Sequence, residues 1–298
     1  PGRVTLIEPD SNLGFIGAVN LGFARALEAD DTPVILLNSD ALVPAGWATR
    51  LVAPLADPAT ASVTPMSNDA ELMSVPAICA RIDLAPGQGD TIDALARTLP
   101  RGEGFSRTGG IALPTGTGFC MALARPWLAR FPGFDPAFGR GYGEEVDWCQ
   151  KTAAAGGRHL GLPGLFVEHR GGASFGTAEK QALLVRNGAV ISARWPRFDS
   201  DVQATIAGDP MATARLALGL AWAASAAASR PPSAIADPDV PAGRVGVWIG
   251  HSMGGGAEHD LARRIARATA AGQGAVVLRL GGERRWRWPS LASPEGLA

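Results

Sequence analysis

The stretch Val34-Ile-Leu-Leu-Asn-Ser-Asp40 decides the fold class, because a short apolar run ends there in three polar residues. A short apolar run with polar residues at its end is typical of a buried strand. Residues 16–29 before it carry apolar side chains at helical spacing, and residues 4–7 form another short apolar run. Strand, helix and strand in this order predict a βαβ unit, which implies a parallel sheet and the α/β class.

The polar residues 38–40 follow the carboxyl end of the predicted strand, where ligands of open α/β sheets bind. A carboxylate such as Asp40 can hold Mg²⁺ or Mn²⁺ there, since both ions prefer oxygen ligands and bridge to phosphates. The same three residue types also begin many ordinary turns. Taken alone, they favour the turn.

Further elements follow from the same patterns. Apolar runs predict strands at residues 61–65 and 118–124 and a strand end at 166–169. Helical spacing predicts helices at residues 47–55, 91–99, 144–155 and 178–193. The rest of residues 66–110 reads as irregular, because it is rich in Gly, Pro and Asp.

The C-terminal third begins with an Ala-rich run at residues 211–229, which contains Arg215. Its Ala and Gly residues are only weakly apolar, so we expect a packed helix rather than a membrane span. Prolines in residues 230–243 predict a linker. A strand at 245–249, a glycine turn at 254–256, a helix at 258–271 and a strand at 275–280 then predict the start of a second α/β domain.

Composition narrows the class of protein. The 298 residues are 46% hydrophobic and 18% charged, which is a globular composition rather than a disordered one. The net charge of −1 gives no electrostatic reason to bind nucleic acid. The three cysteines have no metal-binding spacing, and their odd number suggests buried thiols in a reducing compartment, hence the cytoplasm.

An acidic group stands at the predicted start of the 144–155 helix, where Glu144, Glu145 and Asp147 follow Gly143. Carboxylates at this position stabilise the helix dipole, which is a purely structural role. Crowding also raises the pKa of a carboxyl group, which suits a general base. Either role fits the pattern. A lone His169 before a pair of glycines is likewise a metal ligand or a structural residue.

Considered together, these stretches resemble glycosyltransferase family 2, in particular its rhamnosyltransferase-like members. The resemblance rests on Asn12-Leu-Gly-Phe through Asn20-Leu-Gly-Phe23, Val34 through Asp40, Gly116 through Arg125, Phe134-Asp135, Tyr142-Gly-Glu-Glu-Val-Asp-Trp-Cys149, and His169 with Gly171, Gly172 and Ser174. Two positions depart from the family pattern. Asn38 stands where a full DxD motif has its first Asp, and Glu145 stands where the family has Asp.

The resemblance implies a GT-A domain, a Rossmann-like mixed sheet flanked by helices, that transfers a sugar from a nucleoside-diphosphate sugar with inversion. The acceptor would be a hydroxyl of a glycan or lipid-linked glycan in surface polysaccharide or cell-wall synthesis, with peripheral association at the inner face of the membrane. Asp40 and His169 would hold the Mn²⁺ or Mg²⁺ on the diphosphate, and Glu145 would be the base, with Asp147 able to take that role. Donor contacts would come from Asn12, Gly14, Asn20, Asn38 and Asp40.

The family's first strand and helix are expected before Val4, so residues 1–200 would be a GT-A domain without them. Residues 201–229 would be a helical extension and 230–243 a linker. Residues 244–298 resemble the start of a GT-B glycosyltransferase of the family 4 type, on the strength of Arg244 through Glu258. Two rivals remain: a non-catalytic nucleotide-sugar or glycan-binding module, and a nucleotidyltransferase, against which only the acidic group and His169 argue.

Overall fold

The computed structural model of the chain describes residues 4–29, 31–99, 109–171, 177–228, 245–251, 256–270, 274–280 and 290–291. The strands are β1 (Val34–Leu37), β2 (Ala41–Leu42), β3 (Thr60–Met66), β4 (Ile111–Leu113), β5 (Cys120–Leu123), β6 (Arg158–Phe166), β7 (Glu168–His169), β8 (Val245–His251), β9 (Gly274–Leu280) and β10 (Ser290–Leu291). The α-helices are α1 (Gly14–Glu28), α2 (Trp47–Val52), α3 (Gln88–Ala96), α4 (Arg125–Arg130), α5 (Glu144–Ala154), α6 (Thr177–Arg194), α7 (Phe198–Gly208), α8 (Ala212–Ala228) and α9 (Gly256–Ala270). Single 3₁₀ turns are η1 (Ala53–Ala56), η2 (Glu71–Met73) and η3 (Pro136–Phe138).

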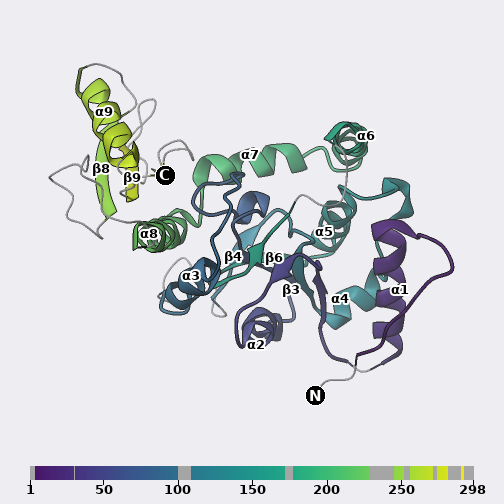
Figure 1. The fold of residues 1–298 in the computed structure, drawn as a ribbon. Coiled ribbons are helices and arrows are strands. Elements are labelled where there is room, and N and C mark those ends of the chain that lie inside the picture. Colours follow the sequence, from purple (N-terminus) through teal and green to yellow (C-terminus); the bar gives the residue numbers. More distant parts are fainter. Residues whose placement is uncertain are drawn as a thin grey trace.

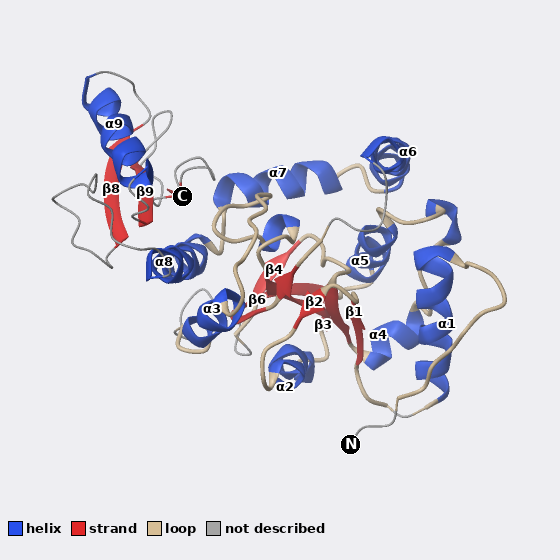
Figure 2. Cartoon of the chain, viewed as in Figure 1, coloured by secondary structure: helices blue, strands red, loops and turns tan. Residues whose placement is uncertain are grey.

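A five-stranded mixed sheet in the order β1-β5-β3-β6-β4 forms the centre of the molecule (Figures 1 and 2). Only β3 and β6 pair in parallel, whereas β1–β5, β5–β3 and β6–β4 are antiparallel. Every residue of the central strand β3 is buried, as expected for a strand covered on both faces. The predicted α/β class, with a mixed sheet flanked by helices, is therefore confirmed.

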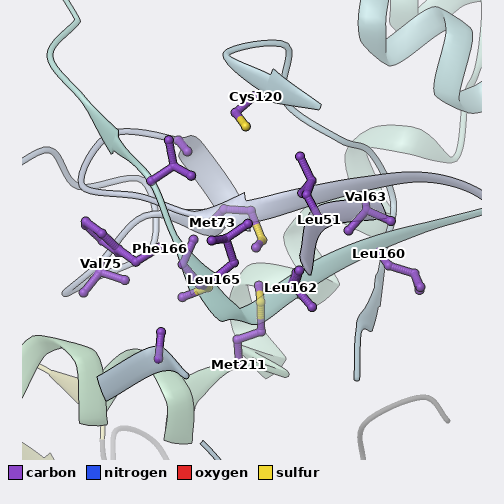
Figure 3. Packing of buried hydrophobic residues seen from close by; sticks show 14 of the residues in the cluster. Leu51, Val63, Met73, Val75, Cys120, Leu160, Leu162, Leu165, Phe166 and Met211 are labelled. Atoms are coloured by element: carbon purple, nitrogen blue, oxygen red, sulfur yellow. The ribbon is translucent and has the colours of Figure 1, made fainter. Parts of the chain in front are cut away.

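The two faces of the sheet carry separate apolar clusters, and β5 shows how they divide. Cys120 and Ala122 belong to one cluster, and Met121 and Leu123 belong to the other, because successive side chains of a strand point to opposite faces. The first cluster packs against α2, α3 and α8, and Figure 3 shows some of its residues, among them Leu51, Val63 and Cys120. The second packs against α1, α4, α5 and α6. The result is a helix–sheet–helix sandwich.

The predicted strand at residues 4–7 is wrong. These residues have no regular structure and are exposed, Val4 at 94%. β1, its predicted parallel neighbour, pairs with β5 instead, and in antiparallel fashion. An apolar run forms a strand only where another strand accepts its hydrogen bonds, and residues 4–7 have no such partner in the described part of the chain. The first predicted βαβ unit is therefore absent.

Several boundaries and elements also differ from expectation. The predicted 91–99 helix begins and ends earlier, as α3, and α7 precedes the predicted Ala-rich helix as a separate helix. Most of β6 was missed, because Gly161, Pro163 and Gly164 weaken its strand pattern. Of the cysteines, Cys120 and Cys149 are buried, but Cys79 is exposed, contrary to expectation.

Helix α8 is the predicted Ala-rich helix, and it lies between the central sheet and the C-terminal strands (Figure 1). It contacts α3 on one side and β8, β9 and β10 on the other. No helix among the described residues combines the length and the apolarity that crossing a bilayer requires.

The C-terminal strands form a second sheet in the order β10-β9-β8. β8 and β9 are parallel, with α9 between them in the sequence, so the βαβ unit predicted here is present. The predicted linker at 230–243 and most of the glycine turn at 254–256 lie outside the described residues.

Candidate active site

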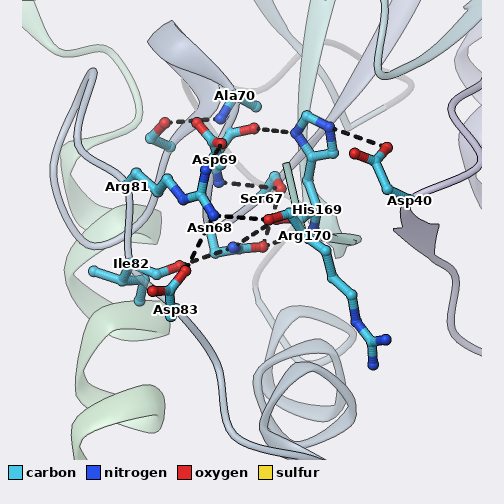
Figure 4. Close-up of polar contacts among 11 residues, drawn as sticks. Asp40, Ser67, Asn68, Asp69, Ala70, Arg81, Ile82, Asp83, His169 and Arg170 are labelled. Atoms are coloured by element: carbon cyan, nitrogen blue, oxygen red, sulfur yellow. Dashed lines mark hydrogen bonds and ion pairs between the residues drawn. The ribbon is translucent and has the colours of Figure 1, made fainter. Parts of the chain in front are cut away.

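A short antiparallel ribbon places Asp40 beside His169. β2 pairs with β7, so that Ala41 lies opposite His169, and the main-chain N–H of Arg170 donates to the oxygen of Asp40 at 3.0 Å. Nε2 of His169 consequently lies 3.4 Å from Oδ1 of Asp40 (Figure 4). The two residues assigned to a metal by resemblance are thus neighbours in space, although they are far apart in the sequence.

The ring of His169 is held in one orientation. Its Nδ1 lies 2.7 Å from the main-chain oxygen of Asp69, and Phe119 stacks on the ring with centroids 4.9 Å apart. A carbonyl oxygen only accepts hydrogen bonds, so a neutral ring carries its proton on Nδ1 and turns the lone pair of Nε2 toward Asp40. A lone pair facing a carboxylate repels it unless a cation or a proton lies between them.

This arrangement fits a divalent cation. Histidines that bind metals commonly donate their other ring N–H to a carbonyl or carboxylate, as His169 does to Asp69. Asp40 and His169 are two ligands, and no group of three or more His, Cys, Asp or Glu suited to a metal occurs among the described residues. Two protein ligands suffice for Mg²⁺-like ions, which keep several waters and bind substrate phosphates.

The main chain that supports His169 belongs to a tightly closed loop after β3, residues 67–79, called here the site loop. Asn68 receives the N–H of His169 at 2.7 Å, and its side-chain amide donates to the oxygens of His169 and Ile82 at 2.9 Å each (Figure 4). Within the loop, Val75 N donates to Ser67 O, and Cys79 N donates to Glu71 O, both at 2.8 Å. The loop therefore has one defined shape.

Two carboxyl groups at the start of α5 form the second part of the site. Oε2 of Glu144 and Oε2 of Glu145 are buried without a hydrogen-bond partner among the described residues. Burial raises the pKa of Glu145 well above its usual range, and the negative charges of Glu144 and Glu71 raise it further. Burial also raises the pKa of Glu144, although hydrogen bonds from its own main-chain N–H and from the side chain of Glu145 lower it. The pair therefore retains a proton at higher pH than ordinary glutamates do.

Asp147 faces a different environment. Its Oδ2 lies 2.5 Å from Nζ of Lys151, and its Oδ1 receives Trp195 Nε1 at 3.0 Å and Arg194 Nη1 at 3.2 Å. Its side chain is almost completely buried among these groups. Asp147 thus holds α5 to α6, and its carboxylate oxygens are occupied by cations and a donor from within the chain.

The predicted donor-binding residues are dispersed over α1 and the end of β1. Oδ1 of Asn12 receives the N–H of Gly14 at 2.9 Å and so closes the turn that starts α1. The side-chain amide of Asn20 makes two hydrogen bonds to the main chain of Phe134. It donates to the oxygen at 2.9 Å and accepts from the N–H at 2.8 Å. Asn38 donates its main-chain N–H to Phe119 O at 2.8 Å, which fixes the turn that carries Asp40.

Sequence reasoning missed Asp69 and Glu71. Asp69 orients the ring of His169. Glu71, two residues further along the site loop, raises the pKa of Glu145 by its negative charge, an effect that ranks third after burial and the charge of Glu144. The loop therefore links the Asp40–His169 pair to the glutamate pair. One signal was available: Ser67, Asn68 and Asp69 follow a buried strand just as residues 38–40 do.

No model of a known protein family matches this sequence, and no curated protein matches it. Among solved structures, the chain is similar to the crystal structure of GalNAc-T7 with UDP, GalNAc and Mn²⁺, at 19% identity and a TM-score of 0.39, over 54% of this chain and 31% of that one. It is also similar to the mannosyltransferase PcManGT from Pyrobaculum calidifontis in complex with GDP-Man and Mn²⁺, at 20% identity and a TM-score of 0.44, over 76% of this chain and 58% of that one. The chain thus spans less than two thirds of the length of either protein.

Proposed function

We propose that residues 1–200 form part of a family 2 glycosyltransferase of the GT-A type, which moves a sugar from a nucleoside-diphosphate sugar to a hydroxyl acceptor. The observation that carries the proposal is the contact between Asp40 and His169, with Nε2 of His169 turned toward the carboxylate. A glycan or lipid-linked glycan is the proposed acceptor, in surface polysaccharide synthesis at the cytoplasmic face of a membrane. The assignment of residues 244–298 to a GT-B domain is part of the same proposal.

A divalent cation bound by Asp40 and His169 would neutralise the charge that develops on the leaving diphosphate. Glu145 would accept the proton of the attacking hydroxyl, because burial and neighbouring charges raise the pKa of this carboxyl group toward that of a useful base. Asp147 is the weaker candidate, since Lys151, Arg194 and Trp195 already occupy its oxygens. A single base supports one displacement and hence inversion, whereas retention through a covalent intermediate would need a second, nucleophilic carboxylate.

The donor site is tested by thermal unfolding with UDP-, dTDP- and GDP-sugars, each with and without Mn²⁺. A donor at about 100 times its dissociation constant stabilises the folded state by ~2.7 kcal/mol, which is readily measured as a rise in Tm. We expect one donor to raise Tm only with Mn²⁺, and Asp40→Ala to abolish that rise. If no donor raises Tm in a Mn²⁺-dependent way, the proposal is contradicted for this chain.

The alternative is a module that binds a nucleotide sugar or glycan without turning it over. It is favoured by the burial of Glu145, because a raised pKa lowers the fraction of this carboxyl group that is ionised and able to act as a base. Detection of free nucleoside diphosphate in the presence of donor, Mn²⁺ and a hydroxyl acceptor would reject the module. A donor that binds and is never consumed would support it.

A further inference from the structure

Arg215 is a buried cation far from the proposed chemistry in the sequence. It lies on α8, and only 3% of the residue is exposed. Its charge is balanced by Asp209, whose carboxylate receives Nε at 3.0 Å and Nη2 at 3.1 Å. Burying a guanidinium costs free energy even when it is paired with a carboxylate. The N–H groups that Asp209 does not bind therefore need other acceptors.

The remaining hydrogen bonds of Arg215 go to the main chain of the site loop. Nη2 donates to the oxygen of Leu72 at 2.9 Å, and Nη1 donates to the oxygen of Ser74. Leu72 directly follows Glu71, whose φ of +49° is an unusual conformation for a residue with a side chain. Such a conformation persists only where surrounding contacts hold it, and two charge-assisted hydrogen bonds from Arg215 are contacts of this kind.

The site loop connects this anchor to both parts of the candidate site. Its Asp69 oxygen fixes the ring of His169, and its Glu71 lies close enough to Glu145 to raise that residue's pKa by its charge. A loop that relaxed away from Arg215 would therefore release the ring and move the charge. Both consequences follow from one side chain on a helix outside residues 1–200.

We propose that Arg215 is a positioning residue for the candidate site, and that α8 belongs to the functional unit as the element that fixes the site loop. The proposal rests on the metal site proposed above. It predicts that Arg215 acts on cation affinity through the orientation of His169, without touching the cation itself. Loss of a group that hydrogen-bonds to a metal ligand typically weakens metal binding about 10- to 100-fold, and displacement of the Asp69 oxygen from His169 would be a loss of this kind.

The test compares Arg215→Met with Leu218→Ala, in the whole chain and below the Tm of both variants. Leu218 lies on the same helix and is fully buried in the apolar cluster around β3 and α3, so its loss weakens packing without removing a hydrogen bond to the loop. Two quantities are measured: Mn²⁺ affinity by titration, and hydrogen exchange of the amides of residues 67–79. Arg215→Lys, which keeps the charge and part of the donor capacity, is the conservative variant.

We expect Arg215→Met to weaken Mn²⁺ binding about 10-fold or more and to speed exchange in the loop, notably at Val75 and Cys79, whose N–H groups bond within the loop. Leu218→Ala should leave both quantities near the wild type, and Arg215→Lys should fall between. Equal affinity and equal loop exchange in Arg215→Met and Leu218→Ala would overturn the proposal. If the wild type binds no Mn²⁺, the proposed metal site is wrong. The role of Arg215 in fixing the loop is tested separately by hydrogen exchange, and unchanged loop exchange in Arg215→Met would contradict it.

Discussion

The main-chain oxygen of Asp69 lies 2.7 Å from Nδ1 of His169, and this contact decides which ring nitrogen faces Asp40. The side chain of Asp69 has another partner, since its Oδ2 lies 3.6 Å from Nη1 of Arg81. The main chain and the side chain of one residue thus serve different purposes, and substitution can separate them.

The first prediction concerns the metal pair. His169→Ala should abolish Mn²⁺ binding, because it removes the nitrogen that faces Asp40. Asp69→Ala should retain binding within a few-fold, because the backbone oxygen that orients His169 remains. Titration with Mn²⁺ by calorimetry or electron paramagnetic resonance measures both. Strong loss of binding in Asp69→Ala would mean that the carboxylate of Asp69 is itself a ligand.

The second prediction separates the two acidic candidates of α5. Glu145→Gln should abolish turnover while donor binding survives, because the proton acceptor is lost. Since the folded-state pKa of Glu145 is raised, ionisation of this buried group costs stability as pH rises above about 4.5. Glu145→Gln should therefore be at least as stable as the wild type at neutral pH, as urea unfolding will measure.

Asp147→Asn is the matched comparison. It weakens ion pairs to Lys151 and Arg194, so it should lower the free energy of unfolding by about 1–3 kcal/mol. The folded fraction should retain measurable turnover. The roles would be reversed if Asp147→Asn eliminated turnover in fully folded protein while Glu145→Gln remained active.

How far the sequence predicts this molecule depends on whether a feature is local. The helices α1 and α5 and the strand β1 followed from apolar spacing, because their own side chains determine which face is buried. Residues 4–7 and β6 could not be predicted in this way. Strand formation depends on partners elsewhere in the chain, and β6 obtains two of them, β3 and β4, despite its glycines and proline.

The same distinction holds for the site. Asp40, Glu145 and His169 could be proposed because each stands at the end of an element and within a recognisable motif. The contact of Asp40 with His169 needed the pairing of β2 with β7, two strands of two residues each, which carry no pattern of their own. The effect of Glu71 on the pKa of Glu145 depends on the shape of the site loop, and Arg215 of the distant helix α8 helps to fix that shape. No local sequence pattern encodes such a contact.

The third prediction concerns the loop before the glutamate pair. Asn187 of α6 is buried, and its Nδ2 lies within 2.9 Å of the main-chain oxygens of Phe138, Gly141 and Tyr142. Asn187→Asp replaces this donor with a group that repels those oxygens, and leaving buried carbonyls unpaired costs about 1–3 kcal/mol. We expect a lower Tm and a lower kcat, because the loop leads directly into Glu144.

Arg186→Ala is the control for this prediction. The neighbouring Arg186 makes one exposed hydrogen bond to Ala137 O at 3.3 Å, so its loss should change Tm and kcat little. Equal effects of the two substitutions on kcat would show that the Asn187 contacts do not position the glutamates.

The last prediction concerns stability in acid. His159 is buried in β6, where its ring lies 2.8 Å from both Ser62 Oγ and the oxygen of Cys149. Burial lowers the pKa of His159 from 6.5 to about 4. At His159 the unfolded chain therefore binds a proton at higher pH than the folded chain does. The free energy of unfolding consequently decreases as pH falls from about 6.5 to about 4, by roughly 3 kcal/mol in total.

His159→Gln should remove this part of the pH dependence, although it lowers stability at pH 7 through poorer packing. His259→Gln, at an exposed position, should leave the dependence as it is. Urea unfolding between pH 7.5 and pH 4 measures each slope, and parallel curves for wild type and His159→Gln would show that folding does not shift the pKa of His159.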